Sequence, residues 1–582
     1  MNAAKPKVVI IGLDGATFRN LSPWMDEGLL PNLKFLVSNG SSGELESTKP
    51  CLSPAAWTSF MTGVNPGKHG VFGFVKPFRT KRYKREIFSS HDIKAKTIFD
   101  ILSDYGKTVG AISLPMTYPP FKINGFMVSC GLTTPSTDFD FTYPKDLFEK
   151  NGIKKEEYIL HVTWTDYPEN EKERFFSDLI KCTEVRKNIS FKLMDEYDLD
   201  LFTIVFGGTD WLQHFCWHII DPTHHKHNPE EAQRLLPLIK NYYHKIDSII
   251  GEFINRVDEN TSLFIVSDHG FGPWQKWIAL QKLLEQKKFL YYINKFSLQK
   301  VIRRAKRKTQ EIRGVLQQTS SIYRKMKSII KPVAQKAKAL FFKKYFKIQK
   351  AKNKFHSIVA GSLDTDYWKS IDWQKTISYT GYANDTIYLN LKGREPEGSI
   401  NPGQEYLKVR NQLIEFLSNL NDPETKNKLK IKIYRNEDIY SGPYSCDGYD
   451  LCLEVEDGLY TFQNGANFSD ISGKTETWTG THKKEGIVIA YGKHFKKAYT
   501  INSAQITDIA PTALYLLGLP VVDDMDGKVL KAAFRDDYLN QTPITFAGTS
   551  KKTEKKATLN SPDGQATTSE KLEKRLADLG YL

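Results

Sequence analysis

The sequence predicts an α/β protein whose central, mostly parallel sheet is flanked by helices. Two observations carry this prediction. Several short apolar runs rich in β-branched residues are typical of strands buried on both faces, as in a parallel sheet. Helix-compatible segments lie between these runs, which is the alternation expected of parallel strands joined by helices. An open sheet of this kind binds its ligands at the carboxyl ends of its strands.

Three of the apolar runs end in acidic residues. The run at 8–11 (VVII) is followed by Asp14, and there is no dinucleotide-binding glycine pattern after it. The run at 199–206 (LDLFTIVF) is followed by Asp210, and the run at 262–266 (SLFIV) by Asp268 and His269. These side chains therefore lie where a ligand site is expected.

The remaining elements follow from hydrophobic periodicity. We expect the segment up to about residue 40 to be helical, and we expect further helices at 55–61, 97–105, 234–256, 404–420 and 505–518. Further strands are expected at 43–47, 108–114, 377–393, 429–434, 450–456 and 486–491. We expect the segment 115–195 to consist of loops and helices that could line a site.

The charge is concentrated in one segment. The 582 residues carry a formal net charge of +15, yet residues 300–354 contain 19 Lys and Arg and a single acid, Glu311. We read 286–358 as a basic helical insertion between two parts of one catalytic domain, 1–285 and 359–540, followed by a linker and short helix at 541–582. The insertion could be a solvated cap or a membrane-surface segment, since 341–355 mixes aromatic residues with Lys. Nucleic-acid binding is less favoured, because no recognised nucleic-acid fold accompanies the charge.

Composition restricts the compartment and the kind of metal site. Six scattered cysteines form no CxxC pair, which excludes a thiolate zinc site and indicates a reducing compartment. The N-terminus lacks a secretory signal pattern, and no run of about 18 apolar residues predicts a transmembrane helix. We expect a cytoplasmic protein, with peripheral contact to a membrane as the alternative.

The segment 50–70 carries the strongest nucleophile candidate. Ser53 stands directly before Pro54 at the start of the helix expected at 55–61. A hydroxyl at a helix N-terminus faces free backbone N–H groups, and such a place favours phosphate and an alkoxide. The alternative is that Ser53 only caps the helix. Thr48, Thr58 and Ser59 are rival nucleophiles of lower rank.

Carboxylates and imidazoles together indicate a divalent metal centre. Oxygen and nitrogen ligands without thiolates suit Zn²⁺ best, with Mn²⁺ as the alternative. Two metal ions flanking one nucleophile could clamp a phosphoryl transfer. The residues in question are Asp14, Ser53, Asp210, His214, Asp268, His269 and His482. His218 and the histidines at 224–227 could also bind metal but are more readily explained as a solvated or pocket-lining loop, and His69 as a structural residue.

Six motifs in order give the chain a resemblance to a known family. They are GLDGAT (12–17), SPAAWTSFMTG…HG (53–70), TDWLQH (209–214), SDHG (267–270), GTH (480–482) and DIAPTALYLLGLP (508–520). The chain resembles the type I phosphodiesterase/nucleotide pyrophosphatase family of the alkaline phosphatase superfamily. The resemblance runs from residue 7 to about 530, interrupted by the basic insertion. It implies the alkaline-phosphatase-like fold and a phosphodiesterase-like hydrolase that takes a phosphate-ester small molecule.

The resemblance also implies a role for each site residue. One metal ion would be held by Asp14, Asp268, His269 and the Ser53 oxygen, and the other by Asp210, His214 and His482. Ser53 would attack phosphorus, and water at the second site would hydrolyse the phosphoserine intermediate.

The chain departs from the family at one position. Nucleotide pyrophosphatases of this family carry Asn where Phe74 stands here. Phe72 and Phe74 could therefore face a lipid-like or other apolar leaving group, and His218 is a further candidate for substrate binding.

Other functions remain open at this stage. A phosphomutase or phosphotransferase of the same superfamily would use the same residues and return the phosphoryl group to an acceptor. A catalytically inactive membrane- or polyanion-binding scaffold is the non-enzymatic alternative. A sulfatase is disfavoured, because the segment 51–55 (CLSPA) lacks the required C/S-x-P-x-R pattern.

Overall fold

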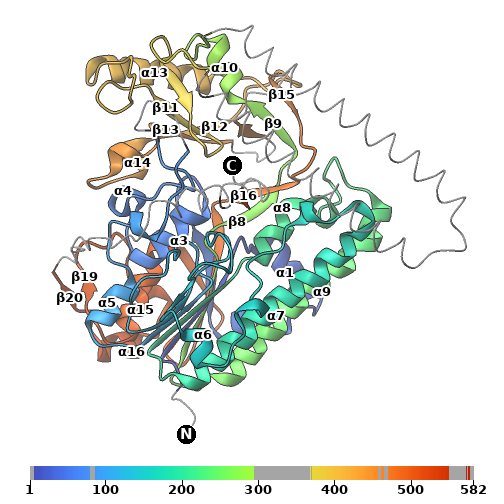
Figure 1. Cartoon of the computed structure of the whole chain (residues 1–582), viewed down its shortest axis with the longest axis vertical. Helices are drawn as coiled ribbons and strands as arrows, with labels where there is room; N and C mark the ends of the chain where they lie inside the picture. Colours follow the sequence, from blue (N-terminus) through green and yellow to red (C-terminus); the bar gives the residue numbers. More distant parts are fainter. Residues whose placement is uncertain are drawn as a thin grey trace, which may run out of the picture.

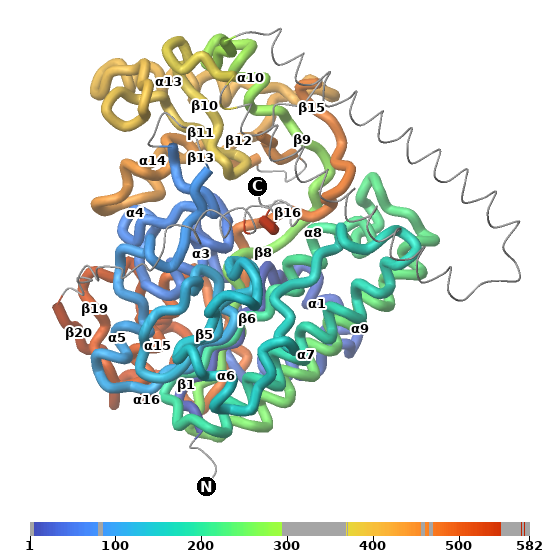
Figure 2. The backbone as a smooth tube through the Cα atoms, viewed as in Figure 1, coloured from blue at the N-terminus to red at the C-terminus, as the bar shows by residue number. Residues whose placement is uncertain are grey.

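The computed structural model describes residues 5–78, 85–293, 370–455, 460–464 and 470–548, together with Trp368, Leu572, Arg575 and Leu576. A large sheet runs through the lower body, and a smaller lobe lies above it (Figures 1 and 2). The large sheet has nine strands in the order β18-β2-β17-β7-β1-β6-β3-β4-β5. Their bounds are β1 Val8–Leu13, β2 Ser41–Glu46, β3 Val109–Ile112, β4 Gly125–Val128, β5 Thr142–Tyr143, β6 Leu201–Phe206, β7 Ser262–Val266, β17 Glu485–Tyr491 and β18 Tyr499–Gln505.

Most neighbouring strands of this sheet are parallel. β1 pairs in parallel with both β6 and β7, and β3 pairs in parallel with β4 and β6. β17 runs antiparallel to β2 and β7, and β5 runs antiparallel to β4. The predicted fold class, a mostly parallel sheet flanked by helices, is confirmed.

The central strands are apolar on both faces because each face is covered by a separate core. In β1, Val8 and Ile10 point into one cluster of buried side chains. Val9, Ile11 and Leu13 point into a second cluster on the opposite face. This alternation follows from the two-residue period of a strand.

Helices cover both faces of the large sheet. One core contains side chains of α3 (Ser53–Thr62), α5 (Ile98–Asp104) and α15 (Ile509–Leu516). The other contains side chains of α1 (Phe18–Asp26), α2 (Pro31–Asn39), α7 (Lys172–Glu196), α8 (Gly208–Ile220) and α9 (Pro229–Arg256). In Figure 1, α7 and α9 lie side by side on one flank while α3, α5 and α15 lie on the other.

A second sheet forms the smaller lobe, here called the cap lobe (370–455). Its strand order is β10-β11-β13-β12, with bounds β10 Ser378–Thr380, β11 Thr386–Leu389, β12 Ile431–Arg435 and β13 Leu451–Val455. Helix α13 (Gln404–Ser418) packs against β12. The strands expected at 377–393, 429–434 and 450–456 therefore exist, but they build this separate sheet. A hydrogen bond of 2.7 Å from the Tyr440 hydroxyl to the Lys49 carbonyl joins the lobe to the body.

Short strands connect the two sheets. β9 (Lys276–Ala279) lies between β14 (Tyr460–Gln463) and β15 (Ser472–Lys474), and β8 (Gly270–Pro273) pairs antiparallel with β16 (Gly480–Lys483). This last pair sets His482 opposite Phe271, just beyond the metal-ligand candidates that follow β7. The pairing thus brings a late segment of the chain to the carboxyl edge of the large sheet.

Three sequence expectations differ in detail from the structure. The segment before residue 40 holds two helices, because α1 ends near Gly28, which has a φ of +80°, and Pro31 begins α2. The segment 115–195 contributes β4, β5 and the 25-residue helix α7. The helix expected at 505–518 begins as a 3₁₀ turn, Ile506–Asp508, before α15.

Two predicted segments fall largely outside the described residues. The basic insertion lies outside them from residue 294 to 367, and the C-terminal linker and helix from residue 549 on, apart from three residues. Of these three, Leu572 and Leu576 pack in an apolar cluster with Phe74 and Leu132.

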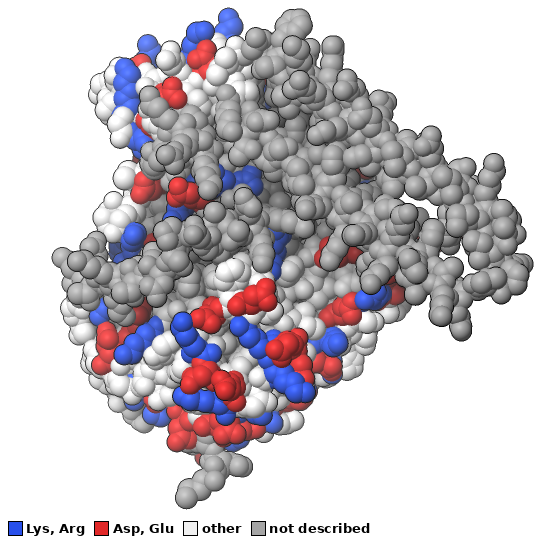
Figure 3. Space-filling view, viewed as in Figure 1, with Lys and Arg blue, Asp and Glu red and all other residues white. Residues whose placement is uncertain are grey.

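On the body, basic and acidic side chains are interspersed (Figure 3). Within the described part of the chain, no helix combines the length and apolarity that a membrane crossing requires.

Candidate active site

The predicted metal ligands converge at the carboxyl edge of the large sheet. Asp14 directly follows β1, Asp210 lies in the first turn of α8 after β6, and Asp268 and His269 follow β7. Because β1 is in parallel register with β6 on one side and β7 on the other, the three strand ends lie next to one another. His482 comes from β16 and completes the set.

Two overlapping groups of side chains have the spacing of metal ligands. Asp14, Asp268 and His269 form one group, and Asp210, His269 and His482 form the other. Within each group the ligand atoms lie within 4.8 Å of one another. His214 adjoins the second group, because its Nε2 is 3.4 Å from Asp210 Oδ1 and 3.0 Å from His482 Nε2. The structure thus brings all six predicted carboxylates and imidazoles together.

The histidine rings are oriented by backbone carbonyls. Each Nδ1 lies near a carbonyl oxygen: 3.3 Å for His214 with Gly480, 3.1 Å for His269 with Gly270 and 2.7 Å for His482 with Cys51. A carbonyl only accepts a hydrogen bond, so the ring proton belongs on Nδ1. Each Nε2 then presents its lone pair to the cluster, which is how a metal-binding imidazole is held.

The carboxylates of the cluster are poorly suited to remain charged without a cation. Burial, together with the charges of Asp268 and Asp210, raises the pKa of Asp14 well above its ordinary value. Burial and the charge of Asp210 raise the pKa of Asp268 to about 7. Among the described residues, the buried atoms Asp14 Oδ1 and Asp268 Oδ2 have no hydrogen-bond partner. Unsatisfied carboxylate oxygens beside imidazole lone pairs fit one or more divalent ions.

Ser53 is the first residue of α3 and lies against the first ligand group. Its Oγ is 3.3 Å from His269 Nε2, and the residue is only 1% exposed. The N-cap of α3 is Leu52, and no side chain caps this helix end. The Ser53 hydroxyl is therefore directed at the ligand cluster rather than used as a helix cap.

The rival hydroxyls are engaged elsewhere. Thr58 donates to the Pro54 carbonyl at 2.6 Å, and Thr48 donates to the Pro50 carbonyl at 3.1 Å. Ser59 Oγ lies 2.9 Å from His69 Nε2. His69 Nδ1 accepts the backbone N–H of Val71, so Nε2 carries the proton and donates to Ser59. Burial lowers the pKa of His69 to about 3, so this pair cannot act as a nucleophile and its base.

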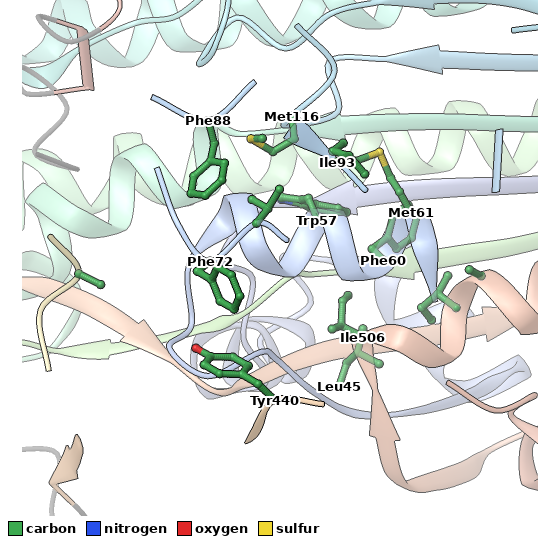
Figure 4. Close-up of a cluster of buried hydrophobic side chains, with 14 of the residues drawn as sticks. Leu45, Trp57, Phe60, Met61, Phe72, Phe88, Ile93, Met116, Tyr440 and Ile506 are labelled. Carbon is green, nitrogen blue, oxygen red and sulfur yellow. The ribbon is translucent and has the colours of Figure 1, made fainter. Parts of the chain in front are cut away.

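The aromatic residues predicted near the substrate are buried. Phe72 is 1% exposed, and its ring packs edge-on against Tyr440 at 5.1 Å (Figure 4). Phe74 is 5% exposed and packs in the cluster with Leu132 and Leu572. Their contact with substrate stays a prediction.

His218 lies two helical turns beyond Asp210 on α8. Its Nδ1 is 3.0 Å from the Thr479 hydroxyl, and its Nε2 is 3.4 Å from Glu231. Neither His218 nor the histidines at 224–227 belong to the ligand groups found among the described residues. A substrate contact by His218 likewise stays a prediction.

Sequence reasoning missed the residues that hold the ligands in place. The indole N–H of Trp57 donates to Asp14 Oδ2 at 3.0 Å. The Gly15 N–H donates to Asp268 Oδ1 at 3.2 Å, and the Thr209 hydroxyl donates to the Asp14 carbonyl at 2.6 Å. The sequence position of Trp57 could have indicated its role, because it lies four residues after Ser53 and therefore on the same helix face.

No curated protein matches the sequence significantly. Human ectonucleotide pyrophosphatase/phosphodiesterase 5 has 13% sequence identity and a TM-score of 0.46, covering 90% of this chain and 97% of its own. Phosphonoacetate hydrolase from Sinorhizobium meliloti 1021, solved in complex with phosphonoacetate, has 13% identity and a TM-score of 0.48, covering 89% and 99%.

The murine pyrophosphatase/phosphodiesterase 5, solved as an inactive variant in complex with AMP, has 13% identity and a TM-score of 0.45, covering 89% and 96%. The family model described as type I phosphodiesterase / nucleotide pyrophosphatase matches residues 8–482, which is most of the chain and includes every predicted metal ligand. The chain therefore belongs to the type I phosphodiesterase / nucleotide pyrophosphatase family, a family of phosphoric ester hydrolases.

Proposed function

We propose that this protein is a two-metal phosphodiesterase that uses Ser53 as its nucleophile and passes through a phosphoserine intermediate. One observation carries the proposal: the Ser53 hydroxyl lies 3.3 Å from His269, the residue that both ligand groups share. A nucleophile at that place is adjacent to both halves of the cluster. Family membership supports the reaction class, hydrolysis of phosphoric esters.

In this proposal each metal ion has its own set of donors. Asp14, Asp268, His269 and the Ser53 oxygen would hold one ion, and Asp210, His214 and His482 would hold the other. When bound, such ions lower the pKa of a coordinated hydroxyl and neutralise charge that develops on a phosphoryl group. Zn²⁺ is the best candidate and Mn²⁺ the alternative, because the donors are nitrogen and oxygen without sulfur.

The chain's own residues define the two chemical steps. Ser53 Oγ attacks phosphorus, a P–Oγ bond forms, the bond from phosphorus to the leaving oxygen breaks, and the Ser53 proton passes through water to that leaving oxygen. In-line geometry sets that leaving oxygen on the side of phosphorus away from Ser53 Oγ. Water then attacks phosphorus, its oxygen bonds to phosphorus, the P–Oγ bond breaks, and a proton of that water goes to Ser53 Oγ.

Metal-dependent hydrolysis of a bis-aryl phosphate tests the proposal. The protein is stripped with a chelator, reloaded with Zn²⁺ or Mn²⁺, and compared with Ser53→Ala. We expect hydrolysis only in the reloaded wild type, and a loss of at least about 1,000-fold in Ser53→Ala, the scale on which removal of a nucleophile acts. Retained activity in Ser53→Ala with its metal content intact would overturn the assignment of the nucleophile.

A panel of substrates tests the finer parts of the proposal. A lipid-like leaving group, and contact of residues 300–355 with a membrane surface, stay predictions, and that segment lies outside the described residues. Rates for monoesters, diesters with short or long apolar leaving groups, and phosphonates would rank these classes. Adding an acceptor alcohol would reveal phosphotransfer as a product distinct from free phosphate.

A further inference from the structure

Trp57 joins the helix that carries the nucleophile to the first group of metal ligands. Its indole N–H donates to Asp14 Oδ2 at 3.0 Å, and the indole is fully buried. Trp57 is one helical turn after Ser53 on α3, so both side chains face the same cluster. The other carboxylate oxygen, Asp14 Oδ1, faces His269 Nε2 at 3.6 Å and has no hydrogen-bond partner among the described residues.

The contact depends on a glycine in the first strand. A Cβ atom at Gly12 would lie 2.6 Å from the edge of the Trp57 ring and 2.8 Å from Val205. Any larger residue at this position would therefore displace the indole. Gly12 leaves the room in which the Trp57 ring can pass β1 and reach Asp14.

We propose that Trp57 is a positioning residue: it holds Asp14 Oδ2 so that Oδ1 alone is presented to a metal ion, and it sets the helix bearing Ser53 in register with that ion. The assignment rests on the proposed two-metal function. A carboxylate whose second oxygen accepts a hydrogen bond is held in one orientation, so the ligand is pre-oriented. Partners of this kind typically contribute about 10–100-fold to metal affinity.

Two substitutions distinguish the positioning role of Trp57 from ordinary packing in the core. Trp57 also packs edge-on against Phe60 at 5.3 Å in the core beside the sheet (Figure 4). Trp57→Phe keeps an aromatic ring in that core and removes the N–H donor. Phe60→Leu is the matched control, because it removes ring bulk from the same helix and the same core without a donor to any ligand.

The test measures metal affinity of the full-length protein by chelator competition with Zn²⁺. We expect two bound ions in wild type, one of them bound about 10–100-fold more weakly in Trp57→Phe, and unchanged affinity in Phe60→Leu. Gly12→Ala is a second variant that displaces the indole without changing it, and it is expected to weaken the same ion. Equal affinity in Trp57→Phe and wild type would overturn the inference and leave the proposed function intact.

A second measurement is independent of activity and of protein stability. In protein labelled with ¹⁵N-tryptophan, the indole signal missing from Trp57→Phe identifies Trp57 among the ten tryptophans. Zn²⁺ should shift that signal more than the signal of Trp373, which packs against Trp368 and Tyr379 in the cap lobe. A signal that does not respond while two ions bind would contradict the role. Absence of any bound ion in wild type would instead refute the proposed function together with this inference.

Discussion

Replacing Asp268 by Asn should stabilise the metal-free protein while it destroys the metal centre. Asp268 Oδ1 accepts the Gly15 N–H, and an Asn side-chain oxygen can do the same. Asp268 Oδ2 is 3.3 Å from His269 Nε2, so the Asn amide can donate to that lone pair. The substitution therefore removes a buried negative charge and keeps the local hydrogen bonding.

The size of the effect follows from the raised pKa of Asp268. Burial, and after it the charge of Asp210, raises this pKa from 3.8 to about 7, which corresponds to a cost of about 3–4 kcal/mol for ionising Asp268 in the empty site.

The pH dependence has a definite sign. The folded state binds the Asp268 proton more tightly than the unfolded state does, so the free energy of unfolding of the metal-free wild type falls as pH rises from about 4 to 7. The amide introduced by Asp268→Asn does not titrate, so the advantage of this variant should approach zero at about pH 4 and reach its full value above about pH 7.

Chemical unfolding in the presence of a chelator measures this difference. We expect Asp268→Asn to be more stable than wild type by about 3–4 kcal/mol at about pH 8, with the order reversed once Zn²⁺ is added, because the variant lacks a ligand. A variant no more stable than wild type under these metal-free conditions would refute the account of the buried carboxylates.

Three further predictions follow from single contacts. His482→Ala should lower the metal content from two ions to one per chain, because it removes a ligand of the second group only. Elemental analysis measures this content, and a variant that still binds two ions would exclude His482 as a ligand. Ser59→Ala should leave bis-aryl phosphate turnover unchanged and cost about 1 kcal/mol of stability through the lost His69 hydrogen bond, and a collapse of turnover would make Ser59 a nucleophile. Phe74→Ala should lower the free energy of unfolding by about 3–5 kcal/mol, because the ring is buried against Leu132 and Leu572. Denaturant titration measures this loss, and a clearly smaller value would contradict the prediction.

The large sheet could be predicted because each of its central strands is a continuous apolar run in the sequence. In β1 every residue from Val8 to Leu13 is buried, so the apolar run marks both the strand and its place inside the sheet. The acidic residues at the strand ends then follow from the parallel arrangement alone. The candidate ligands were accessible to sequence reasoning for this reason.

Long-range pairing could not be predicted from local patterns. The strands of the cap lobe look like core strands, since β11 and β13 are also apolar, and nothing in their composition tells which sheet they join. His482 reaches the site because β16 pairs with β8, a strand from a much earlier part of the chain. The role of Trp57 could not be predicted, because a tryptophan on an apolar helix usually indicates a core residue. Trp57 does also pack in the core.

The central claim is that Ser53 carries the phosphoryl group, and acid quenching of a turnover reaction tests it most directly. Wild-type protein loaded with Zn²⁺ is mixed with a bis-aryl phosphate, quenched within the first turnover, and digested for peptide mass analysis. The account predicts a phosphoryl group on Ser53 of the segment 50–70, and none on that peptide in Ser53→Ala. Rapid release of the first product with no phosphorylated Ser53, or with the phosphoryl group on another residue, would contradict it.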